Sequence, residues 1–333
     1  TWEGLINGKS GAGPITHFDA SKFKTHFACE VKGFDPLEVM DRKEARKCDR
    51  YSLLAISAAK QAVADAAMDL ENENKDRIGV IFAAGIGGIR TFEEEVAGYE
   101  KTKDTIGPKF NPFFIPKMIA DIAAGHISMM YGFRGPNFAT VSACASSTNA
   151  IADAFNYIRL GKANAIVTGG AEAAIAAPGL GGFNAMNALS TRNESPETAS
   201  RPFSASRDGF VMGEGGATLV LENLEHAQKR NATILGEVVG YGSTCDAFHI
   251  TSPDPTGEGA ARAMKQAIDE AGITPDKVGY VNAHGTATHA NDSGESLAIN
   301  KVFGENSSVM VSSTKSMTGH LLGAAGAIEA AIT

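Results

Sequence analysis

Residues 60–84 read KQAVADAAMDLENENKDRIGVIFAA, and residues 264–284 read MKQAIDEAGITPDKVGYVNAH. KQAVADA of the first stretch matches KQAIDEA of the second, and RIGVIFAA matches KVGYVNAH. The intervening loop has ten residues in the first copy (67–76) and five in the second (272–276). Each copy has the pattern of an amphipathic helix, a polar loop and a short buried strand. The sequence therefore contains a repeated α/β unit.

A second match follows the first in the same order along the chain. FATVSACASS (138–147) resembles VMVSSTKSMT (309–318), and both read as a strand, then small polar residues, then a helix. The spacing is far too long for a solenoid. We therefore predict a layered α/β fold made of two related halves, residues 1–232 and 233–333. Equivalent strand–helix junctions would face each other, with Cys144 opposite the Thr314–Lys315 pair.

Composition limits the classes of function. The chain has 333 residues, of which 43% are hydrophobic, so it can bury a large core. Its net charge of −8, without a basic tract, argues against nucleic-acid binding. No apolar run approaches the ~18 residues of a membrane span, and no signal peptide is recognisable. The four cysteines form no CxxC pair, which disfavours a zinc or redox site and favours a reduced, cytoplasmic protein.

Cys144 lies in VSACASSTNA (141–150), where a strand pattern meets a helix pattern. A helix N-terminus presents unpaired N–H groups and partial positive charge, which stabilise a thiolate. We therefore predict a lowered thiol pKa and a nucleophilic role for Cys144. The alternative is that Cys144 is a small hydrophobic residue of the core.

Two histidine motifs strengthen the nucleophile hypothesis. NAHGTATHAND (282–292) places His284 directly after a predicted strand, and STKSMTGHLLGAAGAIEA (313–330) places Lys315 and His320 before a helix. Glycines 319, 323 and 326 are predicted to share one face of that helix and to permit close packing. Structural roles for either histidine remain the alternative.

Two other kinds of site are disfavoured by their spacing. His284, His289 and Asp292 do not have the spacing of an HExxH metal site, so we predict no metal. The glycines near 85–88 and 179–182 match neither GxGxxG nor GxxxxGK[ST], so we predict no nucleotide loop.

The chain resembles the β-ketoacyl-[acyl-carrier-protein] synthases, which are thiolase-fold condensing enzymes of fatty acid synthesis. Six blocks carry the resemblance in family order: GFRGPNFATVSACASS, TGGAEA, ALSTRN, SRPFSASRDGFVMGEGG, NAHGTATHAND and STKSMTGHLLGAAGAIEA. The Cys-His-His set differs from the Cys-His-Asn set of the initiating synthases and from the two cysteines of thiolases. The fourth and sixth blocks look closer to synthase II than to synthase I. The resemblance implies five layers, α-β-α-β-α.

The resemblance also implies a reaction. Cys144 would accept an acyl chain from acyl carrier protein as a thioester. Malonyl carrier protein would lose carbon dioxide, and N–H groups of His284 and His320 would stabilise the enolate. The enolate would attack the thioester and give a product two carbons longer. Lys315 would maintain the electrostatic arrangement. No cofactor would be required, since the phosphopantetheine arm arrives on the carrier protein.

Further roles are implied only by the resemblance, and each of these residues also has an ordinary structural interpretation. The implied sets are the phosphopantetheine arm (Thr286, Thr288), the acyl pocket (Ile86, Gly179, Phe183, Leu322), the partner subunit's pocket in a homodimer (Phe114), a structural monovalent cation or support network (Asn282, Glu329), and an acidic carrier protein (Lys43, Arg46, Lys47). The last three lie in RKEARK (42–47), where a solvated helix face is the alternative.

The chain departs from the family in several places. Family members begin with a further strand and continue beyond the position of Thr333 with two strands and a glycine-rich loop. That loop carries a gating phenylalanine and the second oxyanion N–H, so we expect this chain to be part of a longer protein. His289 stands where the family usually has proline. Two other functions stay open: a synthase of polyketide or specialised lipid synthesis, and a non-condensing partner subunit, which typically lacks the cysteine.

Overall fold

The computed structural model describes residues 1–333, and its larger sheet has the strand order β4-β3-β5-β6. The strands are β3 (Ile78–Ala83), β4 (Asn137–Phe138), β5 (Ala165–Glu172) and β6 (Gly215–Glu222). β3 runs parallel to β4 and β5, and β6 runs antiparallel to β5. Every residue of β3 and β5 is buried, because both faces of the sheet are covered. This explains why RIGVIFAA reads as a continuous apolar run.

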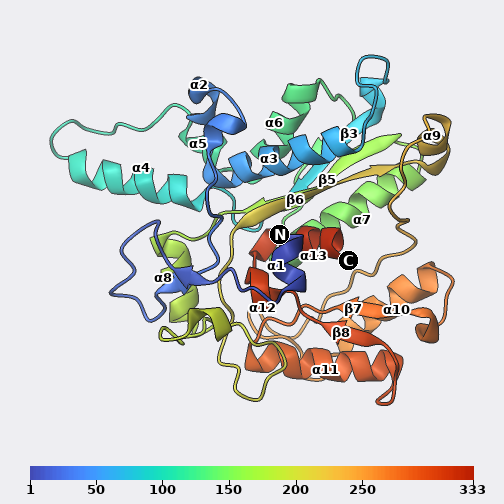
Figure 1. Ribbon diagram of the computed structural model, residues 1–333. Helices are drawn as coiled ribbons and strands as arrows, with labels where there is room; N and C mark the ends of the chain where they lie inside the picture. The colour runs from blue at the N-terminus through green and yellow to red at the C-terminus, as the bar shows by residue number, and fades with distance from the viewer.

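Helices and a second sheet complete five layers (Figure 1). α3 (Arg50–Asp65) and α6 (Ile122–Tyr131) cover one face of the larger sheet, and α7 (Ser146–Arg159) and α13 (Ala325–Ile332) cover the other. Beyond α7 and α13 lie β7 (Tyr280–Asn282) and β8 (Met310–Ser312), which are parallel. α10 (Glu258–Glu270) and α11 (His289–Phe303) form the outermost layer. The predicted α-β-α-β-α arrangement is confirmed.

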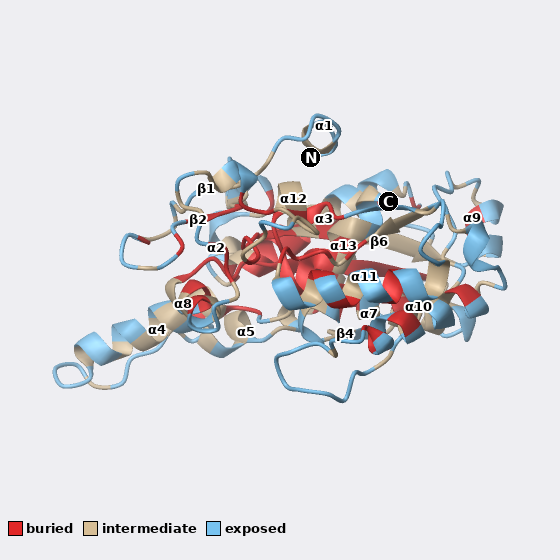
Figure 2. Ribbon diagram, turned by 90° about the horizontal axis from the view of Figure 1, so that it is seen from below, coloured by how far each residue is buried: buried red, intermediate tan, exposed pale blue.

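The remaining elements surround this stack. They are α1 (Trp2–Ile6), β1 (Gly13–Pro14), β2 (Phe27–Ala28), α2 (Arg42–Ala45), α4 (Ile89–Thr102), α5 (Phe114–Met118), α8 (Ala177–Ala185), α9 (Leu224–Lys229) and α12 (Lys315–Thr318). Buried residues concentrate along the larger sheet and the helices on its two faces (Figure 2). No helix combines the length and the apolar character needed to cross a membrane.

The first sequence repeat corresponds to a structural repeat. α3 leads through a short 3-10 turn at Lys75–Arg77 into β3, and α10 leads through a similar turn at Pro275–Lys277 into β7. β3 pairs in parallel with β4, as β7 pairs with β8. The two matched segments therefore fold into the same helix, turn and strand.

The second match is placed differently from our prediction. A 3-10 turn at Ala143–Ala145 precedes α7, and a 3-10 turn at Leu322–Ala324 precedes α13. The first residue of each turn has a positive φ, +51° at Ala143 and +49° at Leu322. Cys144 therefore corresponds to Gly323, and its predicted equivalence with Thr314–Lys315 is wrong. The second half inserts α12 between its strand and its turn, and the insertion displaces the sequence match.

Glycines allow the two halves to meet backbone to backbone. A Cβ at Gly323 would lie 2.1 Å from the Gly85 nitrogen, and a Cβ at Gly170 would lie 3.1 Å from the Gly323 carbonyl oxygen. A Cβ at Gly326 would lie 2.0 Å from the Thr148 Oγ1. The predicted shared helix face of glycines 319, 323 and 326 is wrong, because Gly319 ends α12 and Gly323 lies in the turn before α13. The expected close packing at positions 323 and 326 is present.

We predict that Gly323→Ala destabilises the protein, because the added methyl group overlaps the backbone at Gly85. The expected loss in free energy of unfolding is about 1–3 kcal/mol or more. Urea denaturation measures it. Gly182→Ala is the matched control, since Gly182 lies in α8 with nothing within 4 Å of its added Cβ. That variant should be unchanged or stabilised by about 0.5–1 kcal/mol. Equal stability of the two variants would contradict the close approach.

Candidate active site

Cys144 lies in the middle of the 3-10 turn that enters α7, on the side facing the second half of the chain. The hydroxyl of Ser146 accepts the Ser142 N–H at 2.8 Å and donates to the Ala143 carbonyl at 2.7 Å. Ala143 takes the left-handed conformation, which costs a residue other than glycine on the order of 1–2 kcal/mol. The Ser146 hydroxyl therefore closes a strained turn that presents the Cys144 side chain.

His320 is the nearest polar neighbour of the thiol. Its Nε2 lies 3.0 Å from the Cys144 Sγ, and the Leu322 N–H donates to its Nδ1 at 3.3 Å. Because Nδ1 accepts a hydrogen bond, the neutral ring carries its own proton on Nε2. Burial, His284 and Lys315 all lower the pKa of His320 well below its ordinary value. His320 is therefore a neutral N–H donor directed at the sulfur.

His284 follows β7 and lies against His320, with ring centroids 5.3 Å apart and planes at 86°. Its backbone N–H and that of Gly285 each donate to Glu295 of α11 at 2.7 Å. Burial and the charge of Lys315 lower the pKa of His284 to about 3. The second histidine is thus also neutral, and Glu295 holds its backbone in place.

Lys315 is almost fully buried behind the two histidines and forms an ion pair with Glu329 of α13. The Ser200 hydroxyl donates to its backbone carbonyl at 2.6 Å. Its positive charge contributes to lowering the pKa of His284, His320 and Cys144. Lys315 therefore influences all three groups through its field without contacting the sulfur.

The predicted lowering of the Cys144 pKa is wrong. Burial raises the pKa of the thiol above its ordinary value, and Lys315 only partly opposes this effect. The sequence placed Cys144 correctly at a helix N-terminus, but it could not show how completely the surrounding chain removes water. The resting group is a thiol that receives an N–H from His320.

A metal at this site does not fit the geometry. The Cys144 sulfur and the ring nitrogens of His284 and His320 lie within 4.8 Å of one another, as metal ligands often do. However, a histidine that accepts a backbone N–H at Nδ1 has its proton on Nε2, and that nitrogen cannot bind a metal. The other metal alternative also fails, because His289 is exposed and Asp292 accepts backbone N–H groups of Phe203 and Ala287.

The acyl-pocket candidates lie beside this site. Leu322 and Phe183 belong to one apolar cluster with Phe210, whose ring packs edge-on against His320 at 5.2 Å. A Cβ at Gly179 would lie 2.1 Å from the Ala174 carbonyl oxygen, so this position requires glycine. The backbone of Ile86 is joined through Glu172 to Gly323, the residue after Leu322.

The two threonines lie at the start of α11. Their hydroxyls are 3.0 Å apart, and the Thr288 hydroxyl accepts the Asn291 N–H as the helix cap. Thr286 is buried. Both hydroxyls therefore have structural partners in addition to the binding role that the resemblance implies.

Asn282 and Glu329, the residues that the resemblance assigns to a structural monovalent cation, suit that role only in part. Asn282 donates to the Glu329 carbonyl at 3.5 Å and to the Thr333 hydroxyl at 3.3 Å, while its own side-chain oxygen is buried without a partner. A buried amide oxygen is a suitable ligand for a hard cation. The Glu329 carboxylate is engaged by Lys315, so the support-network interpretation fits the same residues.

Two groups of candidates lie outside the site. Phe114 is the first residue of α5 and stacks on Phe110 with ring centroids 5.6 Å apart, so its ring is engaged by α5's own neighbourhood rather than by the cysteine–histidine cluster. Lys43 and Arg46 are exposed on and just after α2. Lys47 forms an ion pair with Glu44 and lies 5.6 Å from the Phe113 ring.

Sequence reasoning missed the structural roles of three carboxylates around the site, of which Glu172 and Asp292 are buried and Glu295 is half-buried. Glu172 accepts four backbone N–H groups, Glu295 accepts two behind His284, and Asp292 orders the loop at Phe203. Glu172 ends a strand whose other residues are small or apolar, and this isolated charge was the available signal. Glu295 follows Asn291 by four residues in α11, and nothing in the neighbouring sequence indicated that it supports the site.

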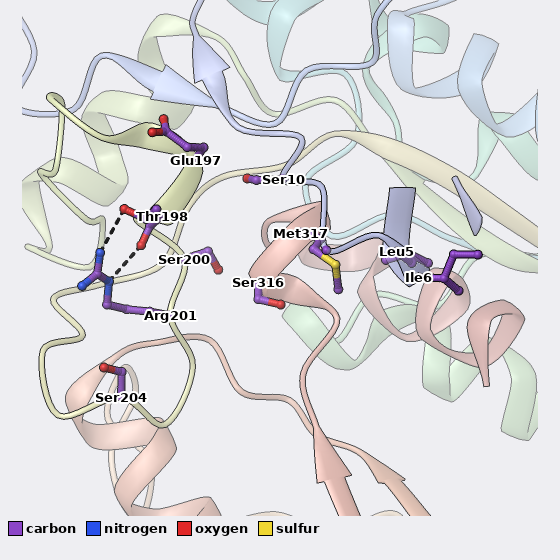
Figure 3. A pocket seen from close by; sticks show the side chains of 11 residues that line it. Leu5, Ile6, Ser10, Glu197, Thr198, Ser200, Arg201, Ser204, Ser316 and Met317 are labelled. Atoms are coloured by element: carbon purple, nitrogen blue, oxygen red, sulfur yellow. Dashed lines mark hydrogen bonds between the residues drawn. The ribbon is translucent and has the colours of Figure 1, made fainter. Parts of the chain in front are cut away.

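A surface pocket of about 640 Å³ lies beside α12 (Figure 3). Its lining is mostly polar, and Arg201 donates to both the carbonyl and the hydroxyl of Thr198. Ser316 and Met317 line it, whereas Cys144 and the two histidines do not. This pocket is therefore separate from the cysteine–histidine site.

Comparison with known proteins gives a consistent result. The chain is 50% identical over 331 residues to 3-oxoacyl-[acyl-carrier-protein] synthase 2 of Staphylococcus aureus, which covers 99% of this chain and 79% of the relative. It is 49% identical to the protein of the same name from Synechocystis, covering 100% of this chain and 79% of the relative. A crystal structure of a β-ketoacyl synthase from Burkholderia phymatum superposes with a TM-score of 0.88 at 35% identity, over 98% of this chain and 79% of that one.

The family models match the chain in two parts. The β-ketoacyl synthase N-terminal domain matches residues 1–227, and the C-terminal domain matches residues 235–333. A structure described as the ishigamide ketosynthase/chain length factor also superposes, with a TM-score of 0.90 at 32% identity, over 99% of this chain and 79% of that one. With the geometry of Cys144, His284 and His320 in place, these matches establish that the chain belongs to the β-ketoacyl synthase family.

Proposed function

We propose that the protein is a β-ketoacyl-[acyl-carrier-protein] synthase II, which elongates fatty acids by decarboxylative condensation of malonyl carrier protein with an enzyme-bound acyl thioester. The observation that carries the proposal is the contact between the Cys144 sulfur and the Nε2–H of neutral His320, with His284 beside it. The 50% identity to named synthases supports fatty acid elongation over the polyketide alternative, since a ketosynthase in complex with a type II PKS acyl-carrier protein is only 33% identical. Cys144 itself argues against a non-condensing partner subunit.

The first half-reaction is acyl transfer. The Cys144 sulfur attacks the carbonyl of the acyl thioester, the bond to the pantetheine sulfur breaks, and the thiol proton passes to the departing pantetheine thiolate. The Nε2–H of His320 stabilises negative charge on the Cys144 sulfur as it forms. The strained turn at Ala143 keeps the sulfur directed toward the incoming carbonyl.

The second half-reaction is decarboxylation and condensation. Carbon dioxide leaves the malonyl group, and the electron pair remaining forms an enolate. Two neutral N–H donors at the enolate oxygen stabilise that charge without a proton transfer, and their low pKa values keep both rings in the donor form. The enolate carbon then attacks the Cys144 thioester and releases the Cys144 thiolate. Burial keeps both rings neutral, and the charge of Lys315 lowers the pKa of each ring further.

The proposed partner is acyl carrier protein. We propose that it contacts the exposed cations Lys43 and Arg46 and the neighbouring Lys47. Carrier proteins are acidic, so cations near the site would speed encounter. Thr286 and Thr288 would bind the pantetheine arm, and Ile86, Gly179, Phe183 and Leu322 would line the acyl pocket. A reducing, cytoplasmic setting fits the four free cysteines.

We further propose that the protein is a homodimer. Within each chain, we propose that the two halves are residues 1–232 and 233–333. β4 is an edge strand, and an unpaired strand edge favours pairing with another chain. Two large apolar side chains are exposed nearby, which also favours association: Met129 of α6, which packs beside β4, and Val141, which follows β4. Phe114 would act across that interface.

We predict that the protein gains the mass of the acyl group on Cys144 when it is mixed with a long-chain acyl carrier protein. Later addition of malonyl carrier protein should release a β-ketoacyl product two carbons longer. Intact-mass spectrometry follows both steps. His320→Ala should slow the second step roughly 10²–10³-fold, because one preorganised donor is lost. His289→Ala, which changes an exposed histidine of the His284 motif, is the control and should retain the rate. No acylation of Cys144 would overturn the proposed function.

We predict that Cys144 alkylation by iodoacetamide accelerates about tenfold per pH unit from about pH 6 to about pH 8, without a plateau. Only the thiolate reacts, and the raised pKa of Cys144 keeps the thiolate a minor species across this range. Lys315→Met should lower the rate at every pH, because the cation that opposes the rise in pKa is removed. A plateau near neutral pH would contradict the dominance of burial.

We predict that Arg46→Glu raises the KM for acyl carrier protein roughly 3–10-fold at low salt, with little change in kcat. Reversing one rim charge weakens the attraction of an acidic partner. Lys229→Glu, on α9, makes the same change of charge away from α2 and is the matched control. Steady-state kinetics at low and high salt measure the effect. Equal KM values for the two variants would remove this surface from the carrier-protein contact.

A further inference from the structure

Glu172 is a buried carboxylate that the proposed mechanism does not use. It is the last residue of β5, is 0% exposed and has no ion-pair partner. Burying a carboxylate without a cation is costly unless several hydrogen bonds compensate. Its only partners are four backbone N–H groups, which come from two segments far apart in the sequence.

Each oxygen of Glu172 has a distinct set of donors. Oε2 accepts the N–H groups of Gly85 at 2.7 Å and Gly323 at 3.0 Å. Oε1 accepts those of Ile86 at 3.2 Å and Gly87 at 3.4 Å. One carboxylate thus joins a loop of the first half to the 3-10 turn of the second half.

The two segments carry parts of the proposed site. The loop after β3 carries Ile86, and the turn before α13 carries Leu322, two of the acyl-pocket candidates. The Leu322 N–H also donates to Nδ1 of His320, which determines which ring nitrogen holds the proton. Glu172 therefore lies behind both the pocket wall and the donor that faces Cys144.

These segments would not approach so closely without an anion between them. A Cβ at Gly85 would lie 2.6 Å from the Glu172 Oε2 and 3.1 Å from the Gly323 nitrogen. Both backbones direct N–H dipoles toward the same point, and such dipoles repel one another unless a negative group accepts them. Burial raises the pKa of Glu172 to about 7, with the four N–H groups opposing the rise. If the Glu172 carboxyl were protonated, its O–H would point at one of these N–H groups, and two donors do not form a hydrogen bond with each other.

We propose that Glu172 is a positioning residue that holds the Ile86 loop and the Leu322 turn together, and so sets both the acyl-pocket wall and the Nε2–H form of His320. The inference rests on the proposed synthase function for its kinetic consequence. Its structural consequence, the protonation pattern of His320, is independent of turnover.

Glu172→Gln tests the proposal. The amide keeps the shape but must direct its NH₂ group at one of the two N–H pairs, so one side of the clamp is lost. We expect the ratio of kcat/KM for long-chain over short-chain acyl carrier protein to fall roughly 10- to 100-fold, because the pocket wall moves. We also expect the nitrogen NMR signals of His320 to change from one N–H form to a mixture.

Glu222→Gln is the matched control. Glu222 is a carboxylate at the opposite end of the β5–β6 pair, where it binds Arg230 and His226. This variant should lose stability through its ion pairs and keep both the chain-length ratio and the His320 signals. If Glu172→Gln does not fold, Glu172→Asp retains the charge with a shorter reach and should give a smaller change of the same kind.

The outcomes separate the two proposals. A folded Glu172 variant with an unchanged chain-length ratio and an unchanged His320 spectrum would overturn the positioning role, while wild-type condensation would leave the synthase function intact. Absence of condensation by wild-type protein would instead defeat the proposed function. In that case the His320 spectrum of the variant still decides whether Glu172 holds the turn.

Discussion

The backbone contact between the Gly85 loop and the Gly323 turn is the constraint on which the site depends. Cys144 and His320 belong to different halves, and neither is held by its own half alone. The turn at Ala143–Ala145 contacts the turn at Leu322–Ala324 where α7 and α13 begin. Glycine at positions 85, 170 and 323 leaves no Cβ between the second turn and the strand ends of the larger sheet. A methyl group at Gly323 would overlap the backbone at Gly85, so the two segments could not keep this approach.

One buried cation organises the electrostatics around this contact. Lys315 lowers the pKa of both histidines and opposes the rise in the pKa of Cys144. Glu329 pairs with it, and Glu295 accepts backbone N–H groups behind His284. The site therefore presents neutral N–H donors and a thiol in a dry environment. Such preorganised donors stabilise developing charge more strongly than water does, because they need no reorganisation.

The fold could be predicted largely from the chain because its two repeats are hydrophobic patterns. Buried strands such as RIGVIFAA and helices such as KQAVADA are defined by local periodicity, and both copies formed the expected helix and strand. The strand of the second copy, β7, is half-buried rather than buried as predicted. The correspondence of Cys144 with Thr314–Lys315 failed because a match in small polar residues does not reveal an inserted helix. Cys144, His284, Lys315 and His320 were all found by motif, and the structure brings them together.

The sequence by itself determined the repeated α/β halves, the helix start at Cys144 and the residue types of the site. These depend on side-chain pattern and on neighbours within a few positions. Only the tertiary structure decided the ionisation of Cys144, the Nε2–H form of His320 and the role of Glu172. Each of these depends on desolvation and on backbone N–H groups from distant segments, which Glu172 joins across 151 positions of the chain at Gly323. Every residue except proline has a backbone N–H, so the residue types at these positions do not reveal which of them donate to Glu172 or His320.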